Sequence, residues 1–207
     1  MTLDTAVGAK QRDAAKTRHL LLQAARQRFA YDGYSATTVR DIANDAGVNV
    51  ALINRYFGNK VGLFAACLER VVEELDRPEE SRLTLERMVE SLVTRVADLP
   101  SGEHPLELLL LIRTSGDEQA DRIRRDTLNS YTERMAAVVG WSADDPSTRH
   151  LLLRAQIAIA TAFGIALLRS STGLEPLASA TAADLAGPLG EVVTGLLRSD
   201  SQATPLP

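Results

Sequence analysis

The sequence predicts an all-α protein, and three observations support this prediction. Residues 37–60 contain two short stretches with the apolar spacing of helices, separated by a glycine. Between about residues 85 and 138, apolar residues recur at helical intervals, and Pro and Gly divide the segments. Residues 147–170 are apolar almost all round, which is typical of a long helix that packs on more than one side.

The stretch from Thr37 to Lys60 has the pattern of two short helices. Apolar residues at i, i+3, i+4 and i+7 give a short helix one face to bury; they are Val39, Ile42, Ala43 and Ala46. Gly47 can adopt the positive φ of a sharp turn, and Asn49 can cap a helix that follows at once. Two short helices joined by such a turn form a helix-turn-helix.

Further motifs extend from about residue 12 to residue 64. They are Thr17-Arg18, Ala24-Ala25, Phe29, Gly33-Tyr34, Thr37-Thr38-Val39, Ile42-Ala43, Ala46-Gly47-Val48, Tyr56-Phe57 and Asn59-Lys60. As a set they resemble the N-terminal DNA-binding domain of the TetR family of transcriptional regulators. Two features depart from that pattern. Asn54 stands where the family most often has Tyr, and Val61-Gly62 replace the usual acidic residues, which weakens the start of the following helix.

The expected organisation is a helical head, a connecting helix and a larger helical body. Residues 1–10 are expected to form a flexible tail, and the first helix to extend from Gln11 to Tyr31. We predict a helix-turn-helix domain over residues 10–60, a connecting helix over 61–76 and an effector-binding and dimerisation domain over 77–200. Pro78 marks the break after the connecting helix, and the residues after Asp200 are expected to be disordered.

The body is predicted to consist of helices over residues 85–96, 105–112, 123–138, 147–170 and 181–198, the last kinked by Pro188. Ala158, Ala162 and Ala166 give the fourth of these helices a face for close approach. The family resemblance implies that the last two helices pair with their copies in a second subunit as a four-helix bundle. The alternative is that they form the core of a monomer.

The charge is divided unevenly along the chain. The net charge is −4, but residues 1–60 hold nine Lys or Arg against five Asp, whereas residues 61–207 hold 14 Arg against 22 acidic residues. A basic head on an acidic body fits a protein that contacts phosphate groups at one end only, although chance could produce the same asymmetry.

We predict that eight residues of the head contact DNA: Thr38, Arg40, Asn49, Val50, Asn54, Arg55, Tyr56 and Lys60. Asn side chains can pair with adenine, Val methyls can contact a thymine methyl, and Arg40 can reach a guanine edge or a phosphate. Each has a structural alternative. Thr38 and Asn49 can cap helices, Arg40 can be merely exposed, and the Tyr56 ring can lie in the core.

Lys60 is the most informative of these residues. It follows Asn59, a candidate cap, and therefore lies in the first turn of the fourth helix, where the helix dipole disfavours a cation. A lysine at this position is explained if a phosphate binds at the helix end and meets both the amides and the ammonium.

The resemblance also implies a small-molecule effector in a mostly apolar cavity of the body. The polar residues that we expect to face it are His104, Arg113, Gln156 and Thr161, each of which could instead be an ordinary core or surface group.

Other classes of function find little support. Cys67 is alone and is expected to be a small buried hydrophobe, and no carboxylate, His or Cys cluster has catalytic or metal-binding spacing. The N-terminal residues lack the apolar core of a signal peptide, and the longest apolar run, Ala155–Leu168, is too short to cross a bilayer. We therefore expect a cytoplasmic protein that is not an enzyme and needs no cofactor or metal.

Taken together, these features predict a TetR-type homodimeric repressor that binds a near-palindromic operator and is released by a small, mostly apolar effector. Two alternatives remain open at this stage. The protein could be an activator or DNA-bound scaffold without an effector, or a helical ligand-binding or catalytic domain whose DNA-binding head is secondary.

Overall fold

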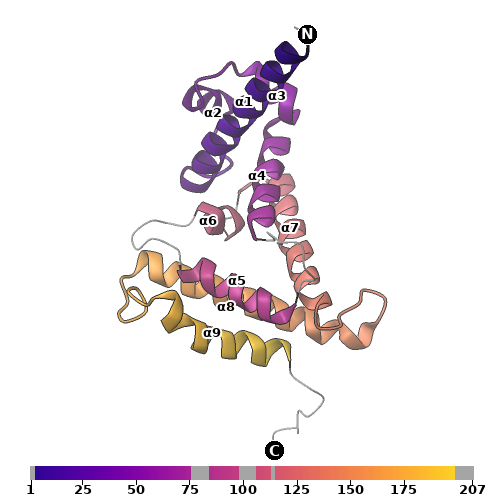
Figure 1. The fold of residues 1–207 in the computed structure, drawn as a ribbon, viewed down its shortest axis with the longest axis vertical. Helices are drawn as coiled ribbons and strands as arrows, with labels where there is room; N and C mark the ends of the chain where they lie inside the picture. Colours follow the sequence, from indigo (N-terminus) through magenta and orange to yellow (C-terminus); the bar gives the residue numbers. More distant parts are fainter. Residues whose placement is uncertain (1–2, 76–83, 98–105, 113–114, 199–207) are drawn as a thin grey trace, which may run out of the picture. The chain divides into compact units, whose positions relative to one another are not determined.

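The computed structural model describes residues 3–75, 84–97, 106–112 and 115–198, and the regular elements in these ranges are all helical (Figure 1). They are α1 (Leu3–Tyr31), α2 (Val39–Asp45), α3 (Ala51–Phe57), α4 (Lys60–Leu75), α5 (Leu85–Ala97), α6 (Leu106–Ile112), α7 (Glu118–Ala137), the short 3₁₀ helix η1 (Pro146–Thr148), α8 (Arg149–Ser171) and α9 (Ala182–Leu197). The all-α prediction is confirmed.

Most helix boundaries lie close to the predicted ones, and the largest difference is at the N-terminus. The expected flexible tail is wrong for residues 3–10, because α1 begins at Leu3. This segment contains one glycine and no proline, so nothing in it interrupts the helix. The predicted break at Pro78 and the tail after Asp200 lie outside the described residues.

The contacts divide the chain into two compact units. Unit 1 comprises residues 1–74 and 109–127, and unit 2 comprises residues 75–108 and 128–207. This grouping differs from the predicted domains, because almost all of α4 belongs to the same unit as α1–α3, and so do the end of α6 and the first half of α7. Helix α7 is continuous and contributes residues to both units.

The core of unit 1 is built on an aromatic cluster. The ring of Tyr34 lies 5.5 Å from that of Phe29 and 5.1 Å from that of Phe64, measured between centroids. The surrounding residues are buried aliphatic side chains of α1–α4, among them Leu21, Leu22, Ile42, Ile53, Leu63 and Leu68. Each such side chain contributes roughly 1.5–3 kcal/mol when it leaves water, so this small core can hold the short helices α2 and α3 in place. Cys67 is also fully buried, as predicted.

In unit 2, helices α5, α8 and α9 pack on one another in pairs (Figure 1). Helix α8 presents small residues to its neighbours, since Ala155, Ala158, Ala162 and Ala166 are all buried. Helices α5 and α9 face each other with larger residues, including Met88, Leu92, Leu189 and Val193. The small-residue face therefore serves packing within the chain.

A second face of α8 remains exposed in the single chain. Leu153, Ile157, Ala160, Gly164 and Leu167 are exposed and follow one another at steps of four and three residues, so they form one stripe. In the part of the chain that the structure describes, one helix, Pro146–Ser171, is long and apolar enough to cross a membrane by length and composition. This helix is longer than the apolar run Ala155–Leu168, because flanking residues at both ends continue the helix.

Candidate nucleic-acid interface

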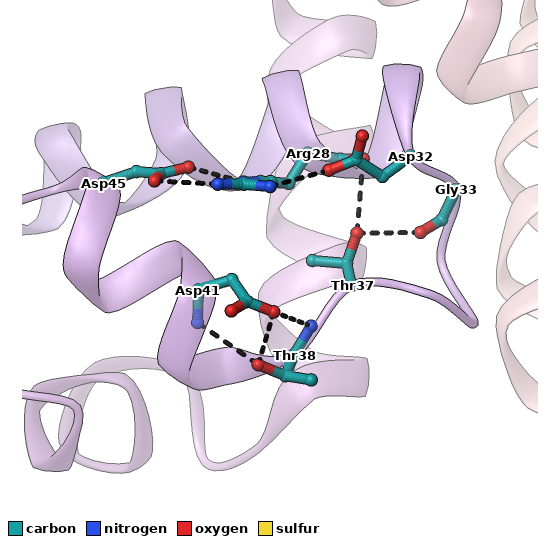
Figure 2. A network of polar contacts seen from close by, with 7 residues as sticks. All are labelled: Arg28, Asp32, Gly33, Thr37, Thr38, Asp41 and Asp45. Carbon is teal, nitrogen blue, oxygen red and sulfur yellow. Dashed lines mark hydrogen bonds and ion pairs between the residues drawn. The ribbon is translucent and has the colours of Figure 1, made fainter.

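Helix α2 begins with a capping box formed by Thr38 and Asp41 (Figure 2). The Thr38 hydroxyl oxygen accepts from the Asp41 amide at 3.2 Å, and the Asp41 carboxylate accepts from the Thr38 amide at 3.1 Å. The Thr38 hydroxyl also donates to this carboxylate at 2.6 Å, and these bonds hold the pKa of Asp41 below its usual range. The capping role of Thr38 is confirmed, whereas a phosphate contact by the same hydroxyl stays a prediction.

Thr37 has a different role, because its side chain is buried. Its hydroxyl donates to the carbonyl oxygens of Gly33 at 2.8 Å and Arg28 at 3.2 Å (Figure 2). These bonds fasten the end of α1 to the residue just before the Thr38 cap. The start of α2 is thereby fixed relative to α1.

Arg28 fixes the other end of α2. Its guanidinium donates to both carboxylate oxygens of Asp45, from Nε at 2.5 Å and from Nη2 at 2.9 Å, and to Asp32 at 3.0 Å (Figure 2). The Asp45 bond is the main reason that the pKa of Arg28 is raised and that of Asp45 lowered. The two acidic groups of α2 are thus engaged within the head, where they do not oppose a phosphate-facing surface.

The turn between α2 and α3 is tight. Gly47 has φ of +65°, and the Val48 amide donates to the Ala43 carbonyl at 3.0 Å. The Asn49 side chain accepts from the Ala51 amide at 2.8 Å, so it caps the first helical residue, and α3 begins at Ala51. The helix-turn-helix predicted from the sequence is therefore present.

Six of the eight residues predicted to contact DNA have exposed side chains: Thr38, Arg40, Asn49, Val50, Asn54 and Arg55. Val50 is an apolar side chain with 38% of its surface exposed at the start of α3, where Ile53 supplies the buried contact. Tyr56 is half-buried, and the Arg55 guanidinium lies 5.8 Å from its ring centroid. Exposed Asn, Arg and apolar groups on one short helix and the turn before it are suited to reading base edges in a major groove.

Asn59 caps α4, as expected, by accepting from the Gly62 amide at 2.8 Å. The Lys60 ammonium lies 4.2 Å from the centroid of the Tyr34 ring, and partial burial lowers its pKa. The structure explains Gly62 as well. A Cβ at this position would lie 2.1 Å from the Phe57 carbonyl oxygen, so glycine allows the end of α3 to approach α4 closely.

Sequence reasoning missed several contributors to this interface. Arg28, whose spacing from Asp32 could have indicated a helical ion pair, also holds Asp45, which no local pattern reveals. The Arg18 guanidinium lies 5.2 Å from the Phe57 ring centroid and so supports the end of α3 from α1. The contact of Tyr34 with Lys60 was likewise unforeseen.

The structure adds little support for the four residues predicted to face an effector. His104 and Arg113 lie outside the described residues, Gln156 is exposed, and the Thr161 hydroxyl donates to the Ile157 carbonyl at 2.9 Å. Their contact with an effector stays a prediction.

A groove between α5 and α9 is a separate feature of unit 2. It has a volume of about 570 Å³ and is lined mainly by Leu85, Val89, Val93, Ala182, Ala183 and Ala186. Polar groups lie along it, and Glu86 and Arg198 form an ion pair between the start of α5 and the end of α9.

Comparison with known families agrees with this geometry. Residues 21–67 match the model of bacterial regulatory proteins of the tetR family, and residues 83–197 match a C-terminal domain described as tetracyclin repressor-like. The chain belongs to the TetR family of transcriptional regulators, with a DNA-binding helix-turn-helix and a C-terminal ligand-binding domain. Helix α3 is the second helix of the motif, the position that the recognition helix occupies in helix-turn-helix proteins.

Curated relatives match only part of the chain. A probable HTH-type transcriptional regulator, YttP of Bacillus subtilis, is 33% identical over 91 residues, which are 42% of this chain and 44% of that protein. The HTH-type transcriptional repressor Rv3405c of Mycobacterium tuberculosis is 44% identical over 57 residues, 28% of this chain and 30% of that protein. The chain therefore matches less than half the length of either.

Solved structures match most of the chain. The TetR-family regulator SCO0857 from Streptomyces coelicolor is 26% identical, with a TM-score of 0.59 over 89% of this chain and 96% of that one. The regulator FadR from Bacillus subtilis, solved in complex with stearoyl-CoA, is 19% identical, with a TM-score of 0.61 over 87% and 97%. The second likeness concerns the fold alone.

Proposed function

We propose that this protein is a homodimeric repressor that binds a near-palindromic operator and leaves it when a small, mostly apolar effector binds. The observation that carries the proposal is the group of exposed Asn, Arg and Val side chains on α3 and the preceding turn. The contacts of Arg28 and Thr38 hold this part of the head in place. Each head would read one half-site, and two half-sites about 34–36 Å apart, or a multiple of that, match a two-fold dimer.

The exposed stripe of α8 supports the dimer. Leu153 and Ile157 expose 57% and 44% of their surface, and on α9 Val192 exposes 46%. Gly164 and Ala160 in the same stripe allow another helix to approach closely. A second copy of the chain would cover this face, which also accounts for a long apolar helix in a protein that works in the cytoplasm.

A charged substitution in the exposed stripe of α8 tests the dimer. Ile157→Glu should give a monomer by analytical ultracentrifugation and weaken operator binding, because two unpaired carboxylates would be buried in the interface. Ala143→Glu, at an exposed position before η1, serves as the control. An Ile157→Glu protein that remains dimeric would contradict this interface.

The effector is supported by the groove between α5 and α9. Its volume of about 570 Å³ falls within the range of small-molecule sites, and its walls are mostly apolar. Effector binding would favour a conformation in which the heads are wrongly spaced for the operator. Such coupling typically amounts to about 1–3 kcal/mol.

The roles of the head residues are separated by two variants. Lys60→Ala should weaken binding to all DNA sequences and reduce the slope of log affinity against log salt by about 1, because one phosphate contact is lost. Arg40→Ala should also relax the sequence preference. Arg87→Ala, an exposed change on α5, controls for the loss of a positive charge. Equal loss of specificity in Lys60→Ala and Arg40→Ala would contradict these roles.

A further inference from the structure

The turn that precedes α7 makes a direct contact with the turn that follows α1, and both belong to unit 1. The Ser35 hydroxyl donates to the Ser115 carbonyl oxygen at 2.5 Å. The next residue, Gly116, has φ of +70°, and a Cβ built on it would lie 3.1 Å from the Ser35 hydroxyl oxygen. A side chain at position 116 would therefore be strained and would press on the contact.

This turn is firmly attached to α7. The Asp121 carboxylate accepts from the Ser115 amide at 2.9 Å, from the Ser115 hydroxyl at 2.8 Å and from Arg124 at 2.6 Å. The Asp117 carboxylate accepts from the Ala120 amide at 2.9 Å and caps the helix. Because these bonds join the turn to the first turns of α7, residues 115–117 are expected to move with α7.

On its other side, Ser35 is joined to the start of α4. It directly follows Tyr34, whose ring packs against Phe29 and Phe64 and carries the Lys60 ammonium at 4.2 Å. The charge of Asp117 acts on the same pair: it counteracts the lowering of the Lys60 pKa by burial. The turn, the aromatic cluster and Lys60 therefore form one continuous set of contacts.

We propose that Ser35, Gly116 and Ser115 form a strap that positions Tyr34 and Lys60, so that α7 acts on the DNA-binding head through the turn after α1 and the first residue of α4. Helix α7 continues beyond Thr127 into unit 2, which gives the strap its link to the ligand-binding domain. Ser35 and the two turn residues are positioning residues, since they act through Lys60. The inference rests on the proposed function, because it assigns Lys60 to a phosphate of the operator.

The test is a double-mutant cycle on DNA binding by the full-length protein. The probe is a duplex selected by the wild-type protein from random sequences. Ser35→Ala removes one hydrogen bond and adds no atoms, so it should weaken binding about threefold to tenfold. In a Lys60→Ala background the same change should have little further effect, because the strap acts through Lys60. Ser179→Ala, which removes an exposed hydroxyl bonded to Glu175, should leave binding unchanged.

Hydrogen exchange gives a second readout that a merely structural role would not change. By reciprocity of coupling, binding of the selected duplex should slow exchange of the Ser115 and Ala120 amides in the wild-type protein. This protection should be absent in Ser35→Ala. If the variants bind as independent changes, or if the protection persists without the Ser35 hydroxyl, the strap is overturned while the proposed function stands. If the wild-type protein selects no duplex, both are overturned.

Discussion

Two neighbouring threonines permit a sharp test of how the head is held together. Thr37→Val keeps the shape of the side chain and removes only its hydroxyl, which donates to the carbonyls of Gly33 and Arg28. Neither carbonyl is left without a donor, because Gly33 still accepts from the Thr37 amide at 3.3 Å and Arg28 from the Asp32 amide at 2.9 Å. The cost should therefore be near 1 kcal/mol, rather than the roughly 1–3 kcal/mol of each orphaned group.

Thr38→Val is the matched change next to it. Here the Asp41 amide loses its acceptor and the capping box opens, so α2 should lose about 1–2 kcal/mol. The assay is native-state hydrogen exchange of the α1 and α2 amides, which reports the free energy of opening in this part of unit 1. A loss above about 3 kcal/mol for Thr37→Val would mean that its carbonyl partners do become unsatisfied, and no loss would mean that the hydroxyl bonds do not form.

Three further outcomes follow from the contacts. The bond to Arg28 lowers the pKa of Asp45 in the folded protein, so the stability that this carboxylate contributes is complete above about pH 4, its unfolded pKa, and is lost as the pH falls through its folded pKa. Asp45→Asn should therefore remove this part of the acid sensitivity, measured by hydrogen exchange of α2. Burial raises the pKa of the Cys67 thiol to about 12, so iodoacetamide should modify it at pH 8 only after unfolding, and rapid modification of the native protein would contradict its burial. Arg169 is buried and donates to the carbonyls of Leu177 at 2.6 Å and Ala180 at 2.8 Å. Arg169→Met leaves both carbonyls without this donor and should lower the free energy of unfolding in urea by about 3 kcal/mol. An unchanged free energy of unfolding would show that these bonds contribute nothing.

The sequence was sufficient for features that arise from local chemistry. The spacing of Val39, Ile42 and Ala43 predicted α2, Gly47 predicted the turn, and Asn59 predicted the start of α4, because each depends on residues within one or two helical turns. The resemblance to TetR regulators extended this local agreement to the family, which the match over residues 83–197 then supported in the body as well.

What the sequence could not provide were contacts between residues far apart in the chain. The pairing of Arg28 with Asp45 and the bond between Ser35 and Ser115 join elements through the fold, and no periodicity encodes them. Gly62 is a different case, because its partner is only five residues away: glycine weakens a helix by propensity, but the Phe57 carbonyl leaves no room for a Cβ. Effector residues were predicted only from polarity, and most polar residues are ordinary core or surface groups that bind no effector.

The most direct test of the account is selection of duplexes from a random library by the intact protein, followed by footprinting of the enriched sequence across a salt series. We expect a near-palindrome with half-sites about one helical turn apart or a multiple of it, protection of both halves and a steep fall in affinity with salt. A folded, dimeric protein that enriches no sequence, or that binds with no dependence on salt, would contradict the assignment of α3 and Lys60 to DNA.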